Sequence, residues 1–206
     1  MKELELLKRV FPNKKDEVKR IILYEALLCF TQYGIEATTI EMIKKKSNIS
    51  IGSIYHHFQN KEGILVALVF AAVDDLNCYR EKYLIQAKNF EESIIAIVLS
   101  YVDWVNDHPN FAEIILAGKF DVYHSEYGAK LEQKELVYKT KLINWLSMPQ
   151  NISHLEHIPV ELIPSLILGI TEHYCRAWLL GRVKYNPIYF RKELAVLALR
   201  LLETYK

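Results

Sequence analysis

Apolar residues recur at helical spacing through most of the chain. Between residues 14 and 33 they follow a 3.6-residue period, the spacing that places side chains on one face of an α-helix. The period ends at Gly34, a residue type that commonly follows the end of a helix. The apolar positions of this first predicted helix are Val18, Ile21, Ile22, Ala26, Cys29, Phe30 and Tyr33.

Short segments that begin with capping residues come next. Thr38 or Thr39 can cap a second helix, and the spacing from Thr38 to Glu41 fits a capping box, in which the two side chains bond reciprocally to the backbone. Ser50 can cap a third short helix, and Asn60 can cap a fourth. The sequence therefore predicts three helices in a domain over residues 1–62, with the fourth beginning at its end.

Asn48 lies in the turn between the second and third predicted helices. Such turns often need a left-handed backbone, which asparagine tolerates better than most residues. Two short helices joined by a turn of three or four residues are typical of a helix-turn-helix. We expect this motif over about residues 39–58.

Longer amphipathic stretches occupy the rest of the chain and predict a second helical domain over residues 63–206. The chain contains only 7 Gly and 6 Pro, which argues against a β-rich fold. We expect an all-α protein of about nine helices. The amphipathic stretches cover residues 61–87, 91–107, 110–120, 125–147, 159–181 and 188–205.

The segment SIGSIYHHFQNKEGIL, residues 50–65, is dense in aromatic and imidazole side chains. A metal site is a poor explanation, because His56 and His57 are adjacent and point about 100° apart on a helix. His154 and His157 are better spaced, but they fall in a predicted loop with only Glu156 as a local carboxylate. We expect no metal and no cofactor, since no HExxH, CxxC or glycine-rich phosphate loop is present.

The same segment fits contact with a phosphate backbone. Small residues at its start, including Gly52, allow close approach to DNA. The Tyr55 hydroxyl and an imidazole N–H can each reach a phosphate oxygen. Ile54 and Phe58 are four residues apart and can face the core together. From the residues alone, core packing explains Ile54 and Phe58, and phosphate contact explains the polar aromatic residues.

Three motifs of fixed spacing lie within residues 14–68. They are Ile22-x-x-x-Ala26-x-x-x-Phe30-x-x-x-Gly34, Ala37-Thr38-Thr39-Ile40-x-x-Ile43 and Ser50-x-Gly52-x-Ile54-Tyr55-x-His57-Phe58-x-x-Lys61-Glu62-x-Ile64-Leu65. This pattern resembles the DNA-binding domain of the tetracycline-repressor-like (TetR) transcriptional regulators. Lys44, Ser47 and Asn48 depart from the family, which usually has Ala, Ala and Gly there, and Cys29 stands where Leu is common.

The resemblance implies a homodimer that places one helix-turn-helix per subunit on double-stranded, pseudo-palindromic operator DNA. In that picture Gly52 allows close approach, and the basic run Lys44–Lys46 adds Lys45 to the DNA-contacting set. The implied phosphate contacts are Thr39, Tyr55, His57 and Lys61, with Ser50 at the leading end of the third helix. The implied base-facing residues are Ile51, Ser53 and His56, and the implied core residues are Ile40, Ile43, Ile54 and Phe58.

Charge and cysteine content add little to this picture. The net charge is +1 overall, but residues 1–62 hold 11 Lys/Arg and 8 Asp/Glu, a mild basic excess on the side predicted to meet DNA. Three widely spaced cysteines outside any CxxC motif favour a reducing compartment. The longest nearly continuous apolar stretch, residues 64–73, is far shorter than the roughly 20 residues that span a bilayer. We expect a cytoplasmic protein that does not enter membranes.

Aromatic side chains at helical spacing in the second domain have two interpretations. Ordinary core packing explains any one of them, whereas together they could line a cavity for a small apolar or aromatic effector. Glu113 and Arg176 are further candidates for polar contacts with it. The predicted pocket residues are Tyr101, Trp104, His108, Phe111, Phe120, Trp145, His173, Tyr174 and Trp178.

The last two predicted helices, 159–181 and 188–205, carry more apolar residues than one core-facing stripe needs. Two subunits that pair these helices would form a four-helix bundle. We therefore expect a homodimer through this region.

The sequence as a whole favours a sequence-specific transcriptional regulator, most simply a repressor that a ligand releases from DNA. A ligand that promotes DNA binding, no ligand at all, or activation fits equally well. An all-α enzyme acting on a small apolar substrate lacks a convergent catalytic set, and a helical interaction module leaves residues 38–62 unexplained. Residues 1–13 fit either a short amphipathic turn against the first helix or a basic arm near the DNA.

Overall fold

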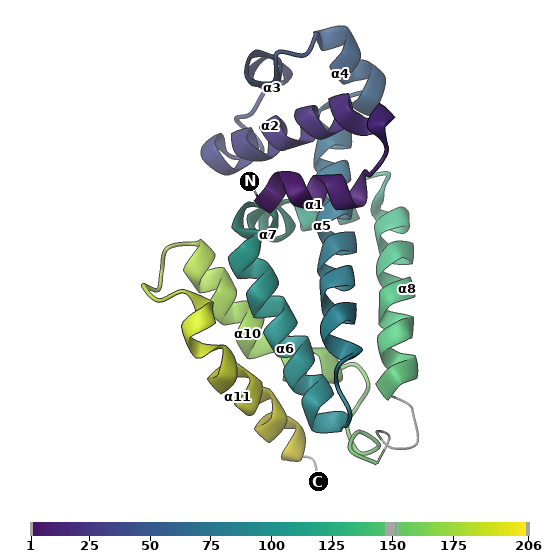
Figure 1. The fold of residues 1–206 in the computed structure, drawn as a ribbon, viewed down its shortest axis with the longest axis vertical. Coiled ribbons are helices and arrows are strands. Elements are labelled where there is room, and N and C mark those ends of the chain that lie inside the picture. Colours follow the sequence, from purple (N-terminus) through teal and green to yellow (C-terminus); the bar gives the residue numbers. More distant parts are fainter. Residues whose placement is uncertain (1, 147–150, 152, 205–206) are drawn as a thin grey trace. The chain divides into compact units, whose positions relative to one another are not determined.

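The computed structural model describes residues 2–146, 151 and 153–204, and every regular element in these residues is helical. The described residues form ten α-helices and two 3₁₀ helices, so the all-α prediction is confirmed (Figure 1). The elements are α1 (Lys2–Val10), η1 (Lys14–Asp16), α2 (Glu17–Tyr33), α3 (Ile40–Ser47), α4 (Ile51–Phe58), α5 (Lys61–Leu84), α6 (Phe90–Asp107), α7 (Pro109–Tyr123), α8 (Gly128–Leu146), α10 (Ile163–Leu179), η2 (Pro187–Phe190) and α11 (Arg191–Glu203).

The chain forms two compact units that interleave along the sequence. Unit 1 comprises the residues up to Asp75 together with His108–Gln133, and unit 2 comprises Leu76–Asp107 together with the residues from Lys134 onward. Both α5 and α8 therefore contribute to the two units. These units are structural, and the expected functional boundary after residue 62 stays a prediction.

Unit 1 is organised around α2, which contacts α1, α3 and α7. The segment 1–13, whose role the sequence left open, contains α1 over Lys2–Val10, and Leu6 and Leu7 of this helix are fully buried. Burying each leucine side chain stabilises the fold by about 1.5–3 kcal/mol. The amphipathic alternative for this segment is the one that matches the structure.

Unit 2 packs α6 against α10 and α11, and α10 also contacts α11. Buried charge ties two of these helices together, because Nη1 of Arg191 on α11 donates to both carboxylate oxygens of Asp103 on α6, at 2.6 and 2.7 Å. The Tyr83 hydroxyl of α5 donates to the same carboxylate at 2.7 Å. Three helices of unit 2 therefore meet at one side chain, Asp103.

No helix within the described part of the chain combines the length and the apolar character needed to cross a bilayer.

Candidate functional site

Both short helices of the predicted helix-turn-helix begin at the hydroxyl residues that their sequence indicates. The Thr39 hydroxyl accepts a hydrogen bond from the Met42 backbone N–H at 3.3 Å, at the start of α3. The Ser50 hydroxyl accepts one from the Ser53 N–H, also at 3.3 Å, at the start of α4. These caps satisfy donors that would otherwise lack partners in the first turn of each helix.

Thr38, the alternative cap for α3, makes hydrogen bonds to the backbone at the end of α2. Its side chain is buried, and its hydroxyl donates to the backbone carbonyls of Cys29 at 3.1 Å and Gly34 at 2.8 Å. The capping box between Thr38 and Glu41 is therefore wrong, because the Thr38 hydroxyl closes the end of α2 instead.

The turn between α3 and α4 has the predicted left-handed residue. Asn48 has φ 56° and ψ 24°, and its N–H donates to the Lys44 carbonyl at 2.9 Å. The Ser47 hydroxyl accepts a hydrogen bond from the Ile49 N–H at 3.3 Å. The turn is thus held by two hydrogen bonds and leads directly into the Ser50 cap.

The two faces of α4 differ sharply in exposure. Ile54 and Phe58 are buried against the rest of unit 1, as their spacing predicts. Ile51 and Ser53 are half-buried at the edges of this face. The exposed side of the helix presents Gly52, Tyr55, His56 and His57.

Gly52 is not required by the packing of the described residues. A Cβ atom added there would meet no described atom within 4 Å, and the residue has an ordinary helical backbone without positive φ. Glycine weakens a helix interior relative to alanine by roughly 0.8–1 kcal/mol. The fold of this chain therefore offers no reason for a glycine on the exposed side of α4.

The lysines of α3 differ in how they are engaged. Lys44 pairs with Glu41 at 3.4 Å, and the Lys46 ammonium donates to the Gln32 side chain at 2.8 Å. Lys45 is exposed and makes no hydrogen bond or ion pair with any residue that the structure describes. Together with Ser50, Lys45 lines a hollow at the α3–α4 turn. Lys45 is therefore the cation of this run that is most accessible to an external anion.

Lys61 is engaged with the backbone of its own unit. Its ammonium group donates to the carbonyl of Ile35 at 2.8 Å and to that of Glu36 at 3.0 Å. An ammonium group has three N–H donors, so these two bonds leave one for a further acceptor. At the start of the same helix, Asn60 accepts a hydrogen bond from the Gly63 N–H at 2.7 Å, so the predicted cap of α5 is confirmed.

The paired histidines lie on the surface of α4. The rings of His56 and His57 are neighbours in an edge-to-face arrangement, with centroids 5.4 Å apart and an angle of 71° between the ring planes. Among the described residues, no group of three or more His, Cys, Asp or Glu side chains is arranged to hold a metal ion.

The residues predicted to line an effector pocket are divided between the units. Unit 1 contains His108, Phe111 and Phe120; the first two are buried, whereas Phe120 is 70% exposed. Nε2 of His108 lies 3.3 Å from Nη2 of Arg9 and 3.8 Å from Oδ2 of Asp75, so this imidazole belongs to a buried polar network. The other six lie in unit 2, where Trp104 is buried, His173 is exposed and the rest are half-buried: Tyr101, Trp104, Trp145, His173, Tyr174 and Trp178.

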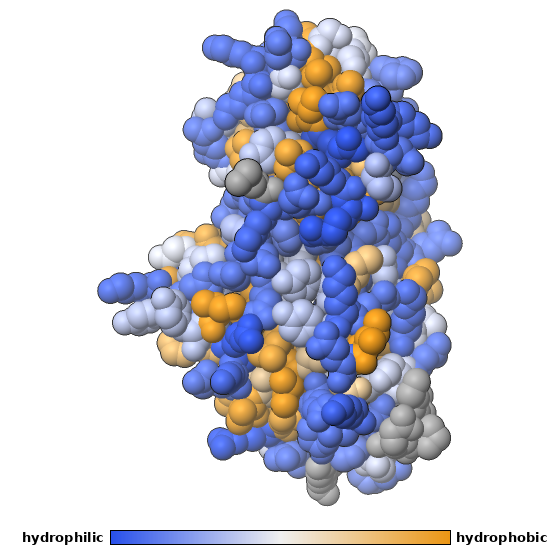
Figure 2. All heavy atoms as spheres, in the orientation of Figure 1, coloured by the Kyte–Doolittle hydropathy of each residue, from blue (hydrophilic) through white to orange (hydrophobic). Residues whose placement is uncertain are grey.

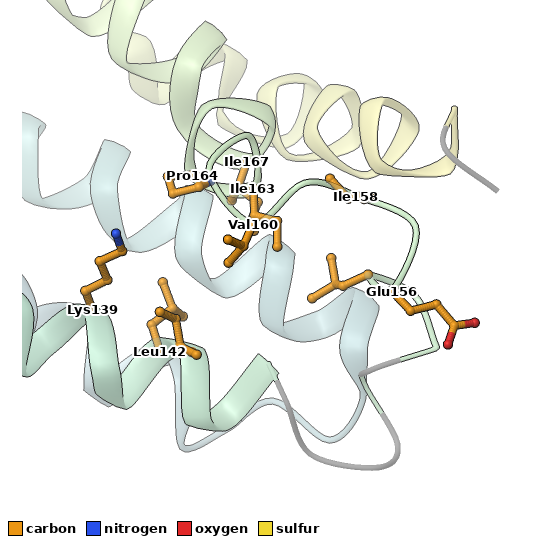
Figure 3. Close-up of a pocket in the computed structure, with 10 residues that line it drawn as sticks. Lys139, Leu142, Glu156, Ile158, Val160, Ile163, Pro164 and Ile167 are labelled. Atoms are coloured by element: carbon orange, nitrogen blue, oxygen red, sulfur yellow. The ribbon is translucent and has the colours of Figure 1, made fainter.

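A separate apolar cavity of about 190 Å³ lies in unit 2, between α8 and the segment that leads into α10 (Figure 3). Aliphatic side chains dominate its wall, and Lys139 and Glu156 are the charged residues that line it. Its apolar lining is Leu142, Ile143, Leu155, Ile158, Val160, Ile163, Pro164 and Ile167.

The sequence-based prediction does not include this cavity, because the predicted pocket residues are mostly aromatic whereas the lining is mostly aliphatic. None of the nine predicted pocket residues lines it. The available signal was the run of aliphatic residues over positions 155–167, which begins in the predicted loop that contains His157 and continues into the predicted helix 159–181. Gln59 has a positive φ of 63°. The sequence does not predict this, because glutamine is not among the residue types enriched in that backbone conformation.

Comparison with known proteins gives consistent matches over part of the chain. The family described as "Bacterial regulatory proteins, tetR family" matches residues 22–68. Over 90 residues the chain is 26% identical to the uncharacterized HTH-type transcriptional regulator YhgD of Bacillus subtilis, covering 44% of this chain and 47% of YhgD. Over 57 residues it is 39% identical to the HTH-type transcriptional repressor KstR2 of Rhodococcus jostii, covering 27% of this chain and 28% of KstR2. The matched part of the chain therefore spans less than half the length of these relatives.

The likeness in three dimensions extends over most of the chain. The structure of the fatty acid degradation regulator FadR from Bacillus halodurans superimposes with a TM-score of 0.72 at 19% identity, covering 87% of this chain and 96% of FadR. At this level of identity the likeness shows a common fold.

Proposed function

We propose that this chain is a member of the TetR family of DNA-binding transcriptional regulators, whose family model matches residues 22–68, and that it is a cytoplasmic, ligand-responsive repressor that binds a pseudo-palindromic operator as a dimer. The family is not an enzyme class. Its regulators bind operator DNA, typically as dimers with small-molecule effectors.

The exposed face of α4 is the observation that carries the proposal. Tyr55 and His57 project from a helix that is capped at Ser50 and anchored by two buried side chains. A phenol and an imidazole on one rigid helix can donate to phosphate oxygens at little cost in side-chain entropy. Gly52, which the packing of the described residues does not require, is explained if the DNA backbone or a base edge approaches there.

The roles of the remaining residues follow from their position. Tyr55, His57 and Lys45 hold phosphates in this proposal, together with the Thr39 cap and the third N–H of Lys61. His56 faces the bases on the exposed side of α4, and the half-buried Ile51 and Ser53 reach them from its edges. Phosphate contacts determine affinity and register, whereas base contacts determine which operator is chosen.

Dimerisation through α10 and α11 is supported by apolar surface that unit 2 leaves exposed. Ile163 and Ile167 of α10 face the core, but Ile170 on the same helix is exposed. On α11, Leu194 is buried, whereas Leu197 is exposed. Figure 2 shows apolar side chains gathered over the region of α11. A second copy that covers these residues would complete a four-helix bundle.

In this proposal a small-molecule effector binds unit 2 and controls DNA binding. The aliphatic cavity between α8 and α10 provides room for a small apolar group. Two recognition helices of a dimer must lie about 34 Å apart to enter successive major grooves. In the proposed mechanism, a ligand favours a dimer with another spacing, so that the operator is released.

Binding to the DNA upstream of the chain's own gene tests the proposal. We expect retarded complexes in a gel-shift assay, with an affinity that falls steeply as salt rises, because each phosphate contact releases counterions. Lys45→Ala is expected to reduce the salt slope by about one contact. Lys88→Ala, which removes an exposed lysine of unit 2, is the matched control and should leave the slope unchanged. An affinity that depends neither on the salt concentration nor on the DNA sequence would overturn the assignment.

A further inference from the structure

Arg80 of α5 carries a charge that the described residues of unit 2 do not satisfy. Its Nε atom is buried and has no hydrogen-bond partner among the described residues. Its Nη1 group donates to the Asn77 side chain, one turn earlier on the same helix, at the long distance of 3.3 Å. The Asn77 side chain is neutral, so this hydrogen bond does not pair the positive charge of Arg80 with a negative charge.

Two side chains on other helices of unit 2 influence Arg80 electrostatically. Glu172 of α10 and Tyr101 of α6 both act electrostatically on the guanidinium group, yet no described carboxylate lies within 4 Å of it. Burial lowers the pKa of Arg80, and the negative charge of Glu172 offsets this only in part. Burial also raises the pKa of Tyr101, so its phenol stays protonated and can donate a hydrogen bond.

A charge in this setting is costly for the fold. Removing a guanidinium group from water without a close counter-charge costs several kcal/mol, and an apolar side chain of similar volume is often the more stable choice. Packing therefore gives no reason for an arginine at position 80. An anion that binds within unit 2 would explain the arginine, because it would provide the missing hydrogen-bond partner.

The Nε–Nη2 edge of Arg80, of which Nε is buried without a partner among the described residues, has a counterpart with a known partner in the same protein. The buried Nε and its neighbour Nη2 form the edge of the guanidinium group opposite to the bond with Asn77. Arg9 uses the same two atoms, Nε and Nη2, to hold the carboxylate of Asp75 in unit 1, at 2.8 and 3.0 Å. A carboxylate or phosphate group presents two oxygens at the spacing this edge requires.

We propose that Arg80 is the anion-binding residue of an effector site in unit 2, and that the effector is a small organic anion with a carboxylate or phosphate group. The Nε–Nη2 edge holds two oxygens of the anion, and Tyr101 supplies a further donor. This inference rests on the proposed function only in naming the anion an effector. The site is distinct from the aliphatic cavity, whose lining does not include Arg80.

Binding to the protein alone, without DNA, tests the site. Benzoate, octanoate, phenyl phosphate and inorganic phosphate are compared at constant ionic strength with benzamide and octanamide, by thermal shift and calorimetry. We expect at least one organic anion to raise the Tm of the wild-type protein and its neutral amide to have no effect. The carboxylates and phenyl phosphate distinguish the two classes of anion, and inorganic phosphate tests whether an organic body is needed.

Substitutions at position 80 separate an anion site from a structural role. Arg80→Met is expected to bind the anion roughly 10- to 100-fold more weakly, while the free variant melts at or above the wild-type temperature. Arg80→Lys keeps the charge without the planar edge, and should bind with intermediate affinity. Arg182→Met removes an exposed arginine of the same unit and should bind like the wild type.

Three results would overturn the inference. They are stabilisation by none of the anions, equal binding of acids and amides, and equal binding by wild type and Arg80→Met. Failure of the protein to bind DNA in a parallel gel shift would contradict the proposed function. The anion measurement would still show whether Arg80 binds an anion, because it is made without DNA. An anion that binds at Arg80 without changing operator occupancy would overturn its role as effector.

Discussion

Arg9 of α1 holds Asp75 of α5 by two hydrogen bonds, from Nε at 2.8 Å and from Nη2 at 3.0 Å. Asp75 is almost fully buried, whereas Arg9 is partly exposed. His108, at the start of α7, lies against both side chains. The first helix of the chain is therefore joined to the centre of unit 1 by a charged contact as well as by its two buried leucines.

Removing Arg9 should destabilise unit 1. Arg9→Met leaves the buried Asp75 carboxylate without its close cation, and we expect a loss of about 2 kcal/mol, below the 3–5 kcal/mol of a fully buried pair because Arg9 is partly solvated. Urea unfolding followed by circular dichroism measures the change. Lys8→Met, which removes an exposed pair with Glu5, should cost less than about 0.5 kcal/mol. Equal losses in the two variants would mean that the contact with Asp75 is not special.

Two nearby glycines should respond in opposite ways to alanine. Gly52→Ala should raise stability by about 0.5–1 kcal/mol through helix propensity, while weakening DNA binding if DNA approaches this position closely. Gly63→Ala should be destabilising, because its Cβ atom would collide with the Phe58 backbone carbonyl. Thermal melts and gel shifts on both variants measure the two effects. A Gly52→Ala variant that binds DNA at full strength would show that α4 does not approach DNA there.

Substitutions on the exposed face of α4 should separate affinity from choice of sequence. Tyr55→Phe and His57→Ala are expected to weaken binding by a similar factor for every operator tested, because a phosphate contact is lost. His56→Ala should instead change the ranking of operators, because a base contact is lost. Gel shifts against a small panel of operator variants distinguish the two patterns. Full-strength binding by the Tyr55 and His57 variants would contradict their assignment.

The hydrogen bond from Tyr83 to Asp103 predicts a dependence of stability on alkaline pH. Burial, together with this hydrogen bond, raises the pKa of Tyr83 to about 12, above the ordinary value of about 10. The neutral phenol is therefore favoured in the folded protein, and its contribution is complete below pH 10 and lost as the pH rises through 12. The difference in stability between wild type and Tyr83→Phe should shrink over this interval. Tyr189→Phe, at an exposed position, should show no such change.

The exposed apolar residues of α10 and α11 predict an interface that a charge would break. Leu197→Glu should convert the dimer to a monomer at micromolar concentration without unfolding unit 2, since Leu197 is not part of its core. Sedimentation and circular dichroism measure the two properties. Lys192→Glu, also exposed on α11, is the control for a change of charge alone. A wild-type protein that sediments as a monomer would contradict dimerisation itself.

Local chemistry explains why the helix-turn-helix could be predicted from the sequence. The caps at Thr39 and Ser50 and the left-handed Asn48 are determined by residues no more than four positions away. The buried pair Ile54 and Phe58 follows from helical period alone. These features need no knowledge of how distant segments pack.

Contacts between distant segments explain what was missed. Lys61 bonds to carbonyls 26 and 25 residues earlier in the chain, and nothing in its immediate sequence indicates them. The aromatic residues of the second domain were grouped by type, but their grouping in space depends on helix packing that divides them between two units. Arg80 is ordinary in the sequence, and only its burial makes it a candidate site.

The two carbonyls bound by Lys61 restrict which residue can serve at the start of α5. A tetrahedral ammonium group can point one N–H at Ile35, one at Glu36 and the third outward. Arginine carries its donors in a planar fork on a longer stem, so it would have to reach the two carbonyls with a different geometry. Replacing Lys61 with arginine would keep the positive charge but change the directions of the N–H donors. Position 61 thus requires a side chain that donates hydrogen bonds to two backbone carbonyls, a stricter demand than the positive charge that DNA alone would ask for.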